Sequence, residues 1–242
     1  MLTTGVDLSS QPARTAACTI GWANGRAEVT ELLPTKVDDT TILSLVSASD
    51  KIGLDVPLGW PDAFVAAVAA HSHGRPWPGG SLHELCFRDT DRHVASETGR
   101  WPLSVSSDRI AIPGFRAAGL LAQLPFTADR SGAGKVVEVY PAAALRRWGL
   151  VAQGYKGRDG IDIRVALVAD FKERTSEWLY LTDDQWHLCE LGDDALDAVI
   201  AAIVTKAFVG GQCDELPAEK LSIAQREGWI ALPLTGSLHR LA

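Results

Sequence analysis

Residues 1–57 follow a strand and helix order that few folds accommodate. Short runs of apolar or β-branched residues occupy 2–8, 15–22, 26–33 and 51–57. The turn Ala23-Asn24-Gly25 separates the second run from the third, which is typical of a tight hairpin, so we expect an antiparallel meander. Apolar residues at helical spacing over 37–47 precede the fourth run. A right-handed strand–helix–strand crossover makes that fourth strand parallel to the first.

Two of these strand-like runs end in an acidic residue. The first ends in Gly5-Val6-Asp7, and the fourth contains Gly53-Leu54-Asp55 before Val56-Pro57. In an α/β sheet, binding sites form at the carboxyl ends of the strands, so both acids are site candidates. An Asp at the start of a loop also commonly bonds its local backbone, so neither residue alone indicates a site.

The segment 193–203 predicts an amphipathic helix. Its apolar residues recur at helical spacing, at Leu196, Val199, Ile200, Ile203 and Ala207. Asp194 and Asp197 are three residues apart and therefore share a helix face. An Asp in the first turn satisfies free N–H groups, which accounts for Asp193 or Asp194. Asp197 lies at the edge of the apolar stripe, where a carboxylate needs a partner such as a bound cation.

Composition limits the class of protein and of partner. The chain has 242 residues, and we expect one domain over 1–242 with an ordinary apolar core. Its net charge of -7 argues against tight, nonspecific binding to long duplexes, but allows a local basic groove or a small anionic substrate. Four scattered cysteines favour a reduced, cytoplasmic protein. The longest apolar stretch is too short to span a bilayer, so no membrane partner is expected.

Residues 60–112 have the least regular pattern. A helical stretch over 64–71 is followed by a Pro- and Gly-rich loop over 75–80 and by the charged cluster 88–92. We expect an insertion that forms a wall or lid of the site. Dense charge in a turn-rich segment, without a helical pairing pattern, predicts that Arg88 and Asp91 point toward the carboxylates.

The second half of the chain returns to alternating elements. Helical or strand-like patterns cover 113–124, 136–141, 142–148, 161–171, the stretch from 183, and 227–233. Glu138 lies on the 136–141 strand, facing away from the sides of Val137 and Val139. The basic loop 153–160 contains Lys156 and is either a phosphate-binding loop or a solvated connector.

The order of elements resembles the ribonuclease H-like fold, an α/β fold with a central mixed sheet flanked by helices. Asp7 and Asp55 resemble the acids that end the first and fourth strands of that superfamily. The sequence Asp194-Ala195-Leu196-Asp197-Ala198 resembles the late-helix signature of RuvC-type Holliday-junction resolvases, although those enzymes commonly have Glu at the position of Asp55. Several blocks in the same order make nearly the whole chain resemble a poorly characterised family of predicted nucleases. These blocks are Gly5-Val6-Asp7, Gly53-Leu54-Asp55-Val56-Pro57, Arg88-Asp89-Thr90-Asp91, Glu138-Val139-Tyr140-Pro141, Gly154-Tyr155-Lys156-Gly157 and the Asp197 helix.

This resemblance implies a metal-dependent nuclease that hydrolyses phosphodiester bonds by a two-metal mechanism with Mg²⁺ or Mn²⁺. The implied metal ligands are Asp7, which would bridge the ions, and Asp55 and Asp197. Asp194 would be a further ligand or a base. The remaining implied site residues are Glu138, as a ligand or as a structural acid paired with an arginine, Arg88 and Lys156, as phosphate contacts, and Asp91 in the same wall.

Two other functions fit the same fold. A non-catalytic nucleic-acid or nucleotide-binding protein is favoured by the acidic composition, whereas the retained acids favour the nuclease. A phosphotransferase of the actin-like ATPase superfamily would need a glycine-rich adenosine motif and a duplicated domain, and the sequence contains neither. A structured or small nucleic-acid substrate is therefore the expected partner.

Overall fold

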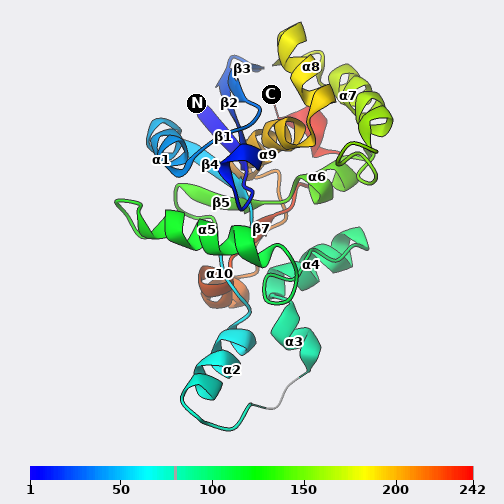
Figure 1. Ribbon diagram of the computed structural model, residues 1–242. Coiled ribbons are helices and arrows are strands. Elements are labelled where there is room, and N and C mark those ends of the chain that lie inside the picture. Colours follow the sequence, from blue (N-terminus) through cyan, green and yellow to red (C-terminus); the bar gives the residue numbers. More distant parts are fainter. Residues whose placement is uncertain (79–80, 242) are drawn as a thin grey trace.

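The computed structural model describes residues 1–78 and 81–241 (Figure 1). The described residues form a seven-stranded sheet in the order β6-β3-β2-β1-β4-β5-β7. The strands are β1 (Leu2–Asp7), β2 (Ala16–Ala23), β3 (Arg26–Leu33), β4 (Lys51–Asp55), β5 (Val136–Val139), β6 (Leu179–Tyr180) and β7 (Ile230–Ala231).

The strand directions confirm the predicted mixed sheet. Strands β1, β2 and β3 form an antiparallel meander, and β4 pairs with β1 in the parallel direction. Strands β5 and β7 extend the parallel half, while the two-residue β6, which the sequence pattern did not predict, pairs with β3. This α/β arrangement agrees with the ribonuclease H-like fold.

Helices cover both faces of the sheet (Figure 1). On one face, α1 (Asp39–Ala48) and α5 (Ala111–Ala122) bury a core that includes Val6 and Leu54. On the other side lie α6 (Pro141–Arg147), α7 (Ile161–Thr175), α8 (Asp183–Leu191) and α9 (Asp193–Val209). Within the described residues, no helix has both the length and the apolar character needed to cross a membrane.

The helix α9 is the most buried element of this second layer. Every residue from 195 to 205 is buried, whereas the sequence pattern predicted a helix with one apolar face. The prediction was wrong because α9 packs on the sheet with one side and against α6 and α8 with others, so it has little contact with water.

Glycines in β1 and β4 allow α9 to lie directly on the sheet. A Cβ atom at Gly5 would overlap the backbone of Ala202, and one at Gly53 would overlap the side chain of Thr205. Because side chains alternate along a strand, the residues two positions after these glycines also face α9. Those residues are Asp7 and Asp55.

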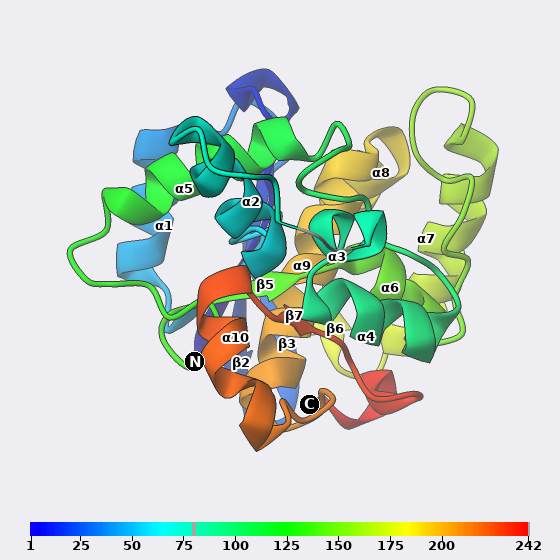
Figure 2. The ribbon, with the colours of Figure 1, turned by 90° about the horizontal axis from the view of Figure 1, so that it is seen from below.

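The segment 60–112 is more regular than the sequence pattern predicted. It contains α2 (Asp62–Ser72), α3 (Leu82–Cys86) and α4 (Asp89–Thr98), and α2 and α3 extend away from the sheet (Figures 1 and 2). The charged cluster at 88–92 is the start of α4, not an irregular loop. The loop expected over 75–80 includes Gly79 and Gly80, which lie outside the described residues. Near the C-terminus, α10 (Leu221–Glu227) was not predicted and leads into β7, which lies in the predicted 227–233 strand.

Candidate metal centre

Three carboxylates from distant parts of the chain meet at one edge of the sheet. Asp7 and Asp55 are register partners at the ends of the parallel strands β1 and β4. Asp197 reaches the same point from α9. We call Asp7, Asp55 and Asp197 the triad. One oxygen from each of these three side chains can be chosen so that all three atoms lie within 4.8 Å of one another.

The spacing of residues along α9 explains how its acids reach the strands. Thr205 packs on β4, and Asp197 lies two turns earlier along the same side of the helix. Ala198 packs on β1, and Asp194 lies one turn before it. The first turns of α9 therefore place Asp194 and Asp197 beside the strand ends.

Two residues of the 153–160 loop contact Asp197. The Tyr155 hydroxyl donates a hydrogen bond of 2.8 Å to Oδ1, and the Lys156 Nζ lies 2.5 Å from Oδ2. The contact with Lys156 is an ion pair without the geometry of a hydrogen bond, so Oδ2 is a buried oxygen with no hydrogen-bond donor among the described residues. An unsatisfied carboxylate oxygen inside the protein is suited to coordinating a cation.

Burial raises the pKa values of all three acids, and repulsion from neighbouring triad acids adds to the shift for Asp7 and Asp55. For Asp7, burial is the largest cause, followed by the negative charges of Asp197 and Asp55. Burial and the neighbouring acids raise the pKa of Asp55 to about 7, although Lys156 opposes the shift. Burial also raises the pKa of Asp197, against the opposing effects of Lys156 and Tyr155. The cluster thus disfavours its own full ionisation unless further positive charge is present.

The chemistry of these donors fits a divalent cation. Hard cations such as Mg²⁺ and Mn²⁺ prefer carboxylate oxygens, and the cluster supplies three such groups at one point. A bound cation would neutralise the repulsion between Asp7, Asp55 and Asp197 and would add a ligand to the Asp197 oxygen that has only the ion pair with Lys156.

The two other acids at the start of α9 have partners of their own. Asp194 accepts a 3.2 Å hydrogen bond from the Arg14 guanidinium, and this contact partly neutralises its charge. Asp193 accepts a hydrogen bond of 3.2 Å from the backbone N–H of Gly157. Gly192, rather than an aspartate, is the N-cap of α9. Asp193 therefore ties the Lys156 loop to the helix instead of capping it.

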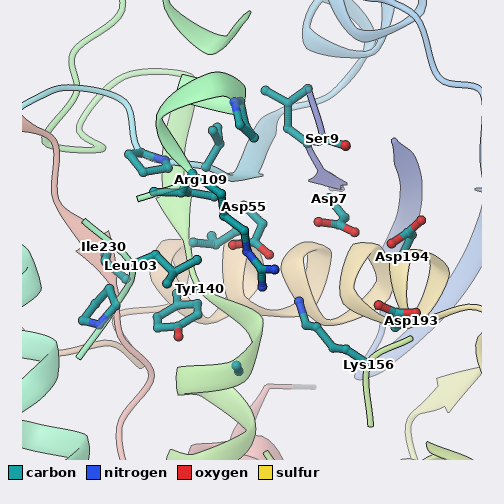
Figure 3. Close-up of a pocket in the computed structure, with 18 of the residues that line it drawn as sticks. Asp7, Ser9, Asp55, Leu103, Arg109, Tyr140, Lys156, Asp193, Asp194 and Ile230 are labelled. Carbon is teal, nitrogen blue, oxygen red and sulfur yellow. The ribbon is translucent and has the colours of Figure 1, made fainter. Parts of the chain in front are cut away.

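Asp7, Asp55, Asp193 and Asp194 line a cleft of about 870 Å³, and Asp197 is buried beneath it (Figure 3). Its sides include the ends of β1 and β4, the loop residues 153–156 and parts of the segment 100–113. The predicted wall segment therefore contributes to the cleft through its last part. Four arginines also line it, at Arg14, Arg88, Arg100 and Arg109.

The family described as "Protein of unknown function (DUF429)" matches residues 5–221. The chain belongs to the DUF429 family. The match begins at Gly5 and so includes all three acids of the cluster, but the family description names no activity. Neither the curated proteins nor the solved structures include a significant match to the chain.

In this DUF429 chain, Arg88, Asp91 and Glu138 form a buried ion-pair network. Arg88 donates two hydrogen bonds to Glu138, of 2.7 and 2.8 Å, and two to Asp91, of 2.9 and 3.1 Å. Its fifth N–H donates to the carbonyl of Glu227 at 3.0 Å. With all five donors used, Arg88 has none left for a phosphate. The predictions that Arg88 contacts a phosphate and that Asp91 points toward the triad are therefore wrong.

The contacts of Glu138 match the second of its two predicted roles, a structural acid paired with an arginine. Besides Arg88, it accepts a hydrogen bond of 2.9 Å from the backbone N–H of Leu58. Burial raises its pKa, while Arg88 opposes that shift. Both carboxylate oxygens of Glu138 are therefore engaged, which argues against a further metal ligand.

Sequence reasoning missed three residues near the centre. Tyr155 precedes the predicted Lys156, and its tyrosine hydroxyl in a glycine-bounded loop was the available signal. Arg14 and Arg109 lie in short turn regions without a recognisable motif, and only the folded chain places them at the acids.

Proposed function

We propose that this protein is a metal-dependent phosphodiester hydrolase, a nuclease that uses Mg²⁺ or Mn²⁺ held by Asp7, Asp55 and Asp197. The observation that supports this proposal is the convergence of three carboxylates within 4.8 Å at the carboxyl end of parallel strands. Structural acids in a protein are normally paired with cations, as Glu138 is here with Arg88. The triad has only Lys156 as a direct cationic partner among the described residues.

Each residue of the site has a distinct role in this proposal. Tyr155 orients Asp197 through its 2.8 Å hydrogen bond, and Lys156 neutralises part of the charge and is the nearest cation to bind a phosphate oxygen. Asp194, which lies near Asp7 in Figure 3, accepts the proton of an attacking water in this proposal. A bound divalent cation supplies Lewis acidity, which activates water and stabilises negative charge on the phosphate.

The experiment combines cation binding with hydrolysis. Titration calorimetry with Mn²⁺ should show binding to the wild type and none to Asp7→Asn, while Mn²⁺ should support hydrolysis of a phosphodiester only in the wild type. Asp184→Asn is the matched control, since Asp184 is an exposed aspartate outside the cleft lining. Cation binding without any hydrolysis would favour a non-catalytic binding protein, and absence of binding would overturn the metal site.

A further inference from the structure

The cleft has two chemically different sides. The ends of β1, β4 and α9 contribute the acids, whereas Leu103, Ile112 and Tyr140 contribute apolar and aromatic surface to the lining. Leu103 and Ile112 keep 43% and 57% of their surface exposed. Figure 3 shows Leu103 and Tyr140 together, across the cleft from Asp7 and Asp194. An exposed apolar surface within a cleft is typical of a site for an organic ligand.

An arginine lies between these two sides. The Arg109 side chain is exposed and points into the cleft (Figure 3). It forms no side-chain hydrogen bond or ion pair with the residues that the structure describes. Within the described part of the chain, Arg100 makes only a long contact of 3.4 Å, to the carbonyl of Ala152. The planar guanidinium of Arg109 is therefore free to bind a phosphate group in two-point fashion.

The size of the cleft suits a small ligand. A volume of about 870 Å³ falls in the range of pockets that enclose a single organic molecule. The long polyanion that a nuclease usually binds needs an extended basic surface, because several phosphates must be neutralised together. This chain instead has a net charge of -7.

The charged residues of the cleft also favour a small ligand over a long polyanion. Five cationic side chains line it: Arg14, Arg88, Arg100, Arg109 and Lys156. Five carboxylates also line it, with Asp197 beneath them. Because Asp91 also pairs with Arg88, two divalent cations at the triad would make this pocket locally positive within an acidic protein. That combination favours a small anion over a long one.

We propose that the substrate is a small phosphodiester of dinucleotide size rather than a long nucleic acid. Arg109 binds its phosphate, and a base lies against Leu103, Ile112 and Tyr140. Water adds to phosphorus, the bond to one ester oxygen breaks, and the proton from water ends on the departing alcohol. The inference rests on the proposed hydrolase function and specifies the substrate of that same site.

The first test is binding without turnover. Thymidylyl-thymidine is titrated by calorimetry into the protein with Ca²⁺ in place of Mg²⁺. Arg109→Gln should weaken binding about tenfold, since it removes charge-assisted hydrogen bonds. Arg26→Gln, an exposed arginine outside the cleft lining, should leave binding unchanged. Failure of the dinucleotide to bind, or an equal effect of both substitutions, would overturn the inference.

The apolar side of the cleft has its own pair of variants. Ile112→Ser should weaken dinucleotide binding severalfold but leave the binding of inorganic phosphate unchanged, because only the base contacts Ile112. Val65→Ser is the control, since Val65 is 53% exposed on α2, outside the cleft lining. Equal weakening of phosphate and dinucleotide binding would show that Ile112 does not contact a base and would contradict the proposal.

Hydrolysis then separates this inference from the proposed function. With Mn²⁺, kcat/KM per phosphodiester should be higher for the dinucleotide than for long single-stranded or duplex DNA and RNA. A preference for the long polymers would overturn the small substrate while leaving the hydrolase function intact. If Mn²⁺ binds but no phosphodiester of either size is cleaved, both the substrate and the hydrolase function fail.

Discussion

The backbone of Ala202 in α9 lies so close to Gly5 in β1 that no side chain larger than hydrogen fits between them. Gly53 in β4 lies equally close to the side chain of Thr205. This close approach brings the first turns of α9 to the ends of the two strands. The acidic cluster therefore depends on two glycines that contribute no functional group of their own.

Gly5→Ala should destabilise the protein, because the new methyl group would force α9 away from the sheet. We expect a loss of about 1–3 kcal/mol or more in the free energy of unfolding, as for other overpacked cores. Urea denaturation measures it. Gly119→Ala is the control: Gly119 lies in α5 with open space around its Cα, so this change should be neutral or slightly stabilising. Equal stability of the Gly5→Ala variant and the wild type would contradict this packing.

Asp7→Asn should separate the metal-binding role of Asp7 from a structural one. Without metal, we expect the variant to be as stable as the wild type or slightly more stable, because repulsion from Asp55 and Asp197 is relieved. Mn²⁺ should raise the melting temperature of the wild type by ligand linkage, but not that of the variant. A strongly destabilised variant and a wild type that does not respond to metal would instead make Asp7 a structural hydrogen-bond acceptor.

The stability of the metal-free protein should depend on pH through Asp55. Its folded-state pKa of about 7 lies above the ordinary value of 3.8, so the folded protein holds the proton more tightly than the unfolded chain does. The contribution of Asp55 to stability is therefore greatest below its ordinary pKa and is lost as the pH rises through about 7. Melting temperatures between pH 5 and 8 should fall less steeply for Asp55→Asn than for the wild type. Parallel slopes would refute the shift.

Glu138→Gln tests whether Glu138 is structural. The substitution weakens the charge-assisted hydrogen bonds from Arg88, which keeps Asp91 as its ionic partner, and we expect a loss of about 1–3 kcal/mol in the free energy of unfolding. Mn²⁺ should still raise the melting temperature of the variant, because both Glu138 oxygens bond to groups other than the triad. Loss of that response, with stability retained, would make Glu138 a metal ligand.

Lys156→Met should change metal affinity in the opposite direction to Asp7→Asn. The Lys156 Nζ forms an ion pair with Asp197 at 2.5 Å and so competes with a cation for that carboxylate. We expect tighter Mn²⁺ binding by calorimetry, together with slower phosphodiester hydrolysis, because a phosphate contact is removed. Lys172→Met, which removes an exposed pair with Asp183, should change neither quantity. Weaker Mn²⁺ binding by Lys156→Met would exclude competition.

Local pattern was sufficient for most of the fold. The Asn24-Gly25 turn specified the hairpin between β2 and β3, and the strand–helix–strand order predicted that β4 runs parallel to β1. The same alternation identified Asp7 and Asp55 as neighbours. These features depend on residues close in sequence and on the regular geometry of strands, so they can be read without the tertiary structure.

The partners that a charged side chain finds in distant segments could not be predicted in the same way. The sequence placed Arg88 among the phosphate contacts, but the folded chain surrounds it with Asp91, Glu138 and the carbonyl of Glu227. A buried guanidinium must satisfy all its donors, and which acceptors meet it depends on how β5 and α10 pack around the start of α4. Likewise, the sequence predicted one apolar face for α9, but the sheet, α6 and α8 bury this helix on several sides.

The sequence by itself determined the strand acids, the helix that contains Asp197 and the glycines that precede Asp7 and Asp55. Only the tertiary structure decided which charges are free and which are paired: Glu138 is committed to Arg88, whereas Arg109 faces the cleft. The physical reason is that periodicity depends on neighbours along the chain, while the partner of a charged side chain is chosen by contacts between segments far apart in sequence.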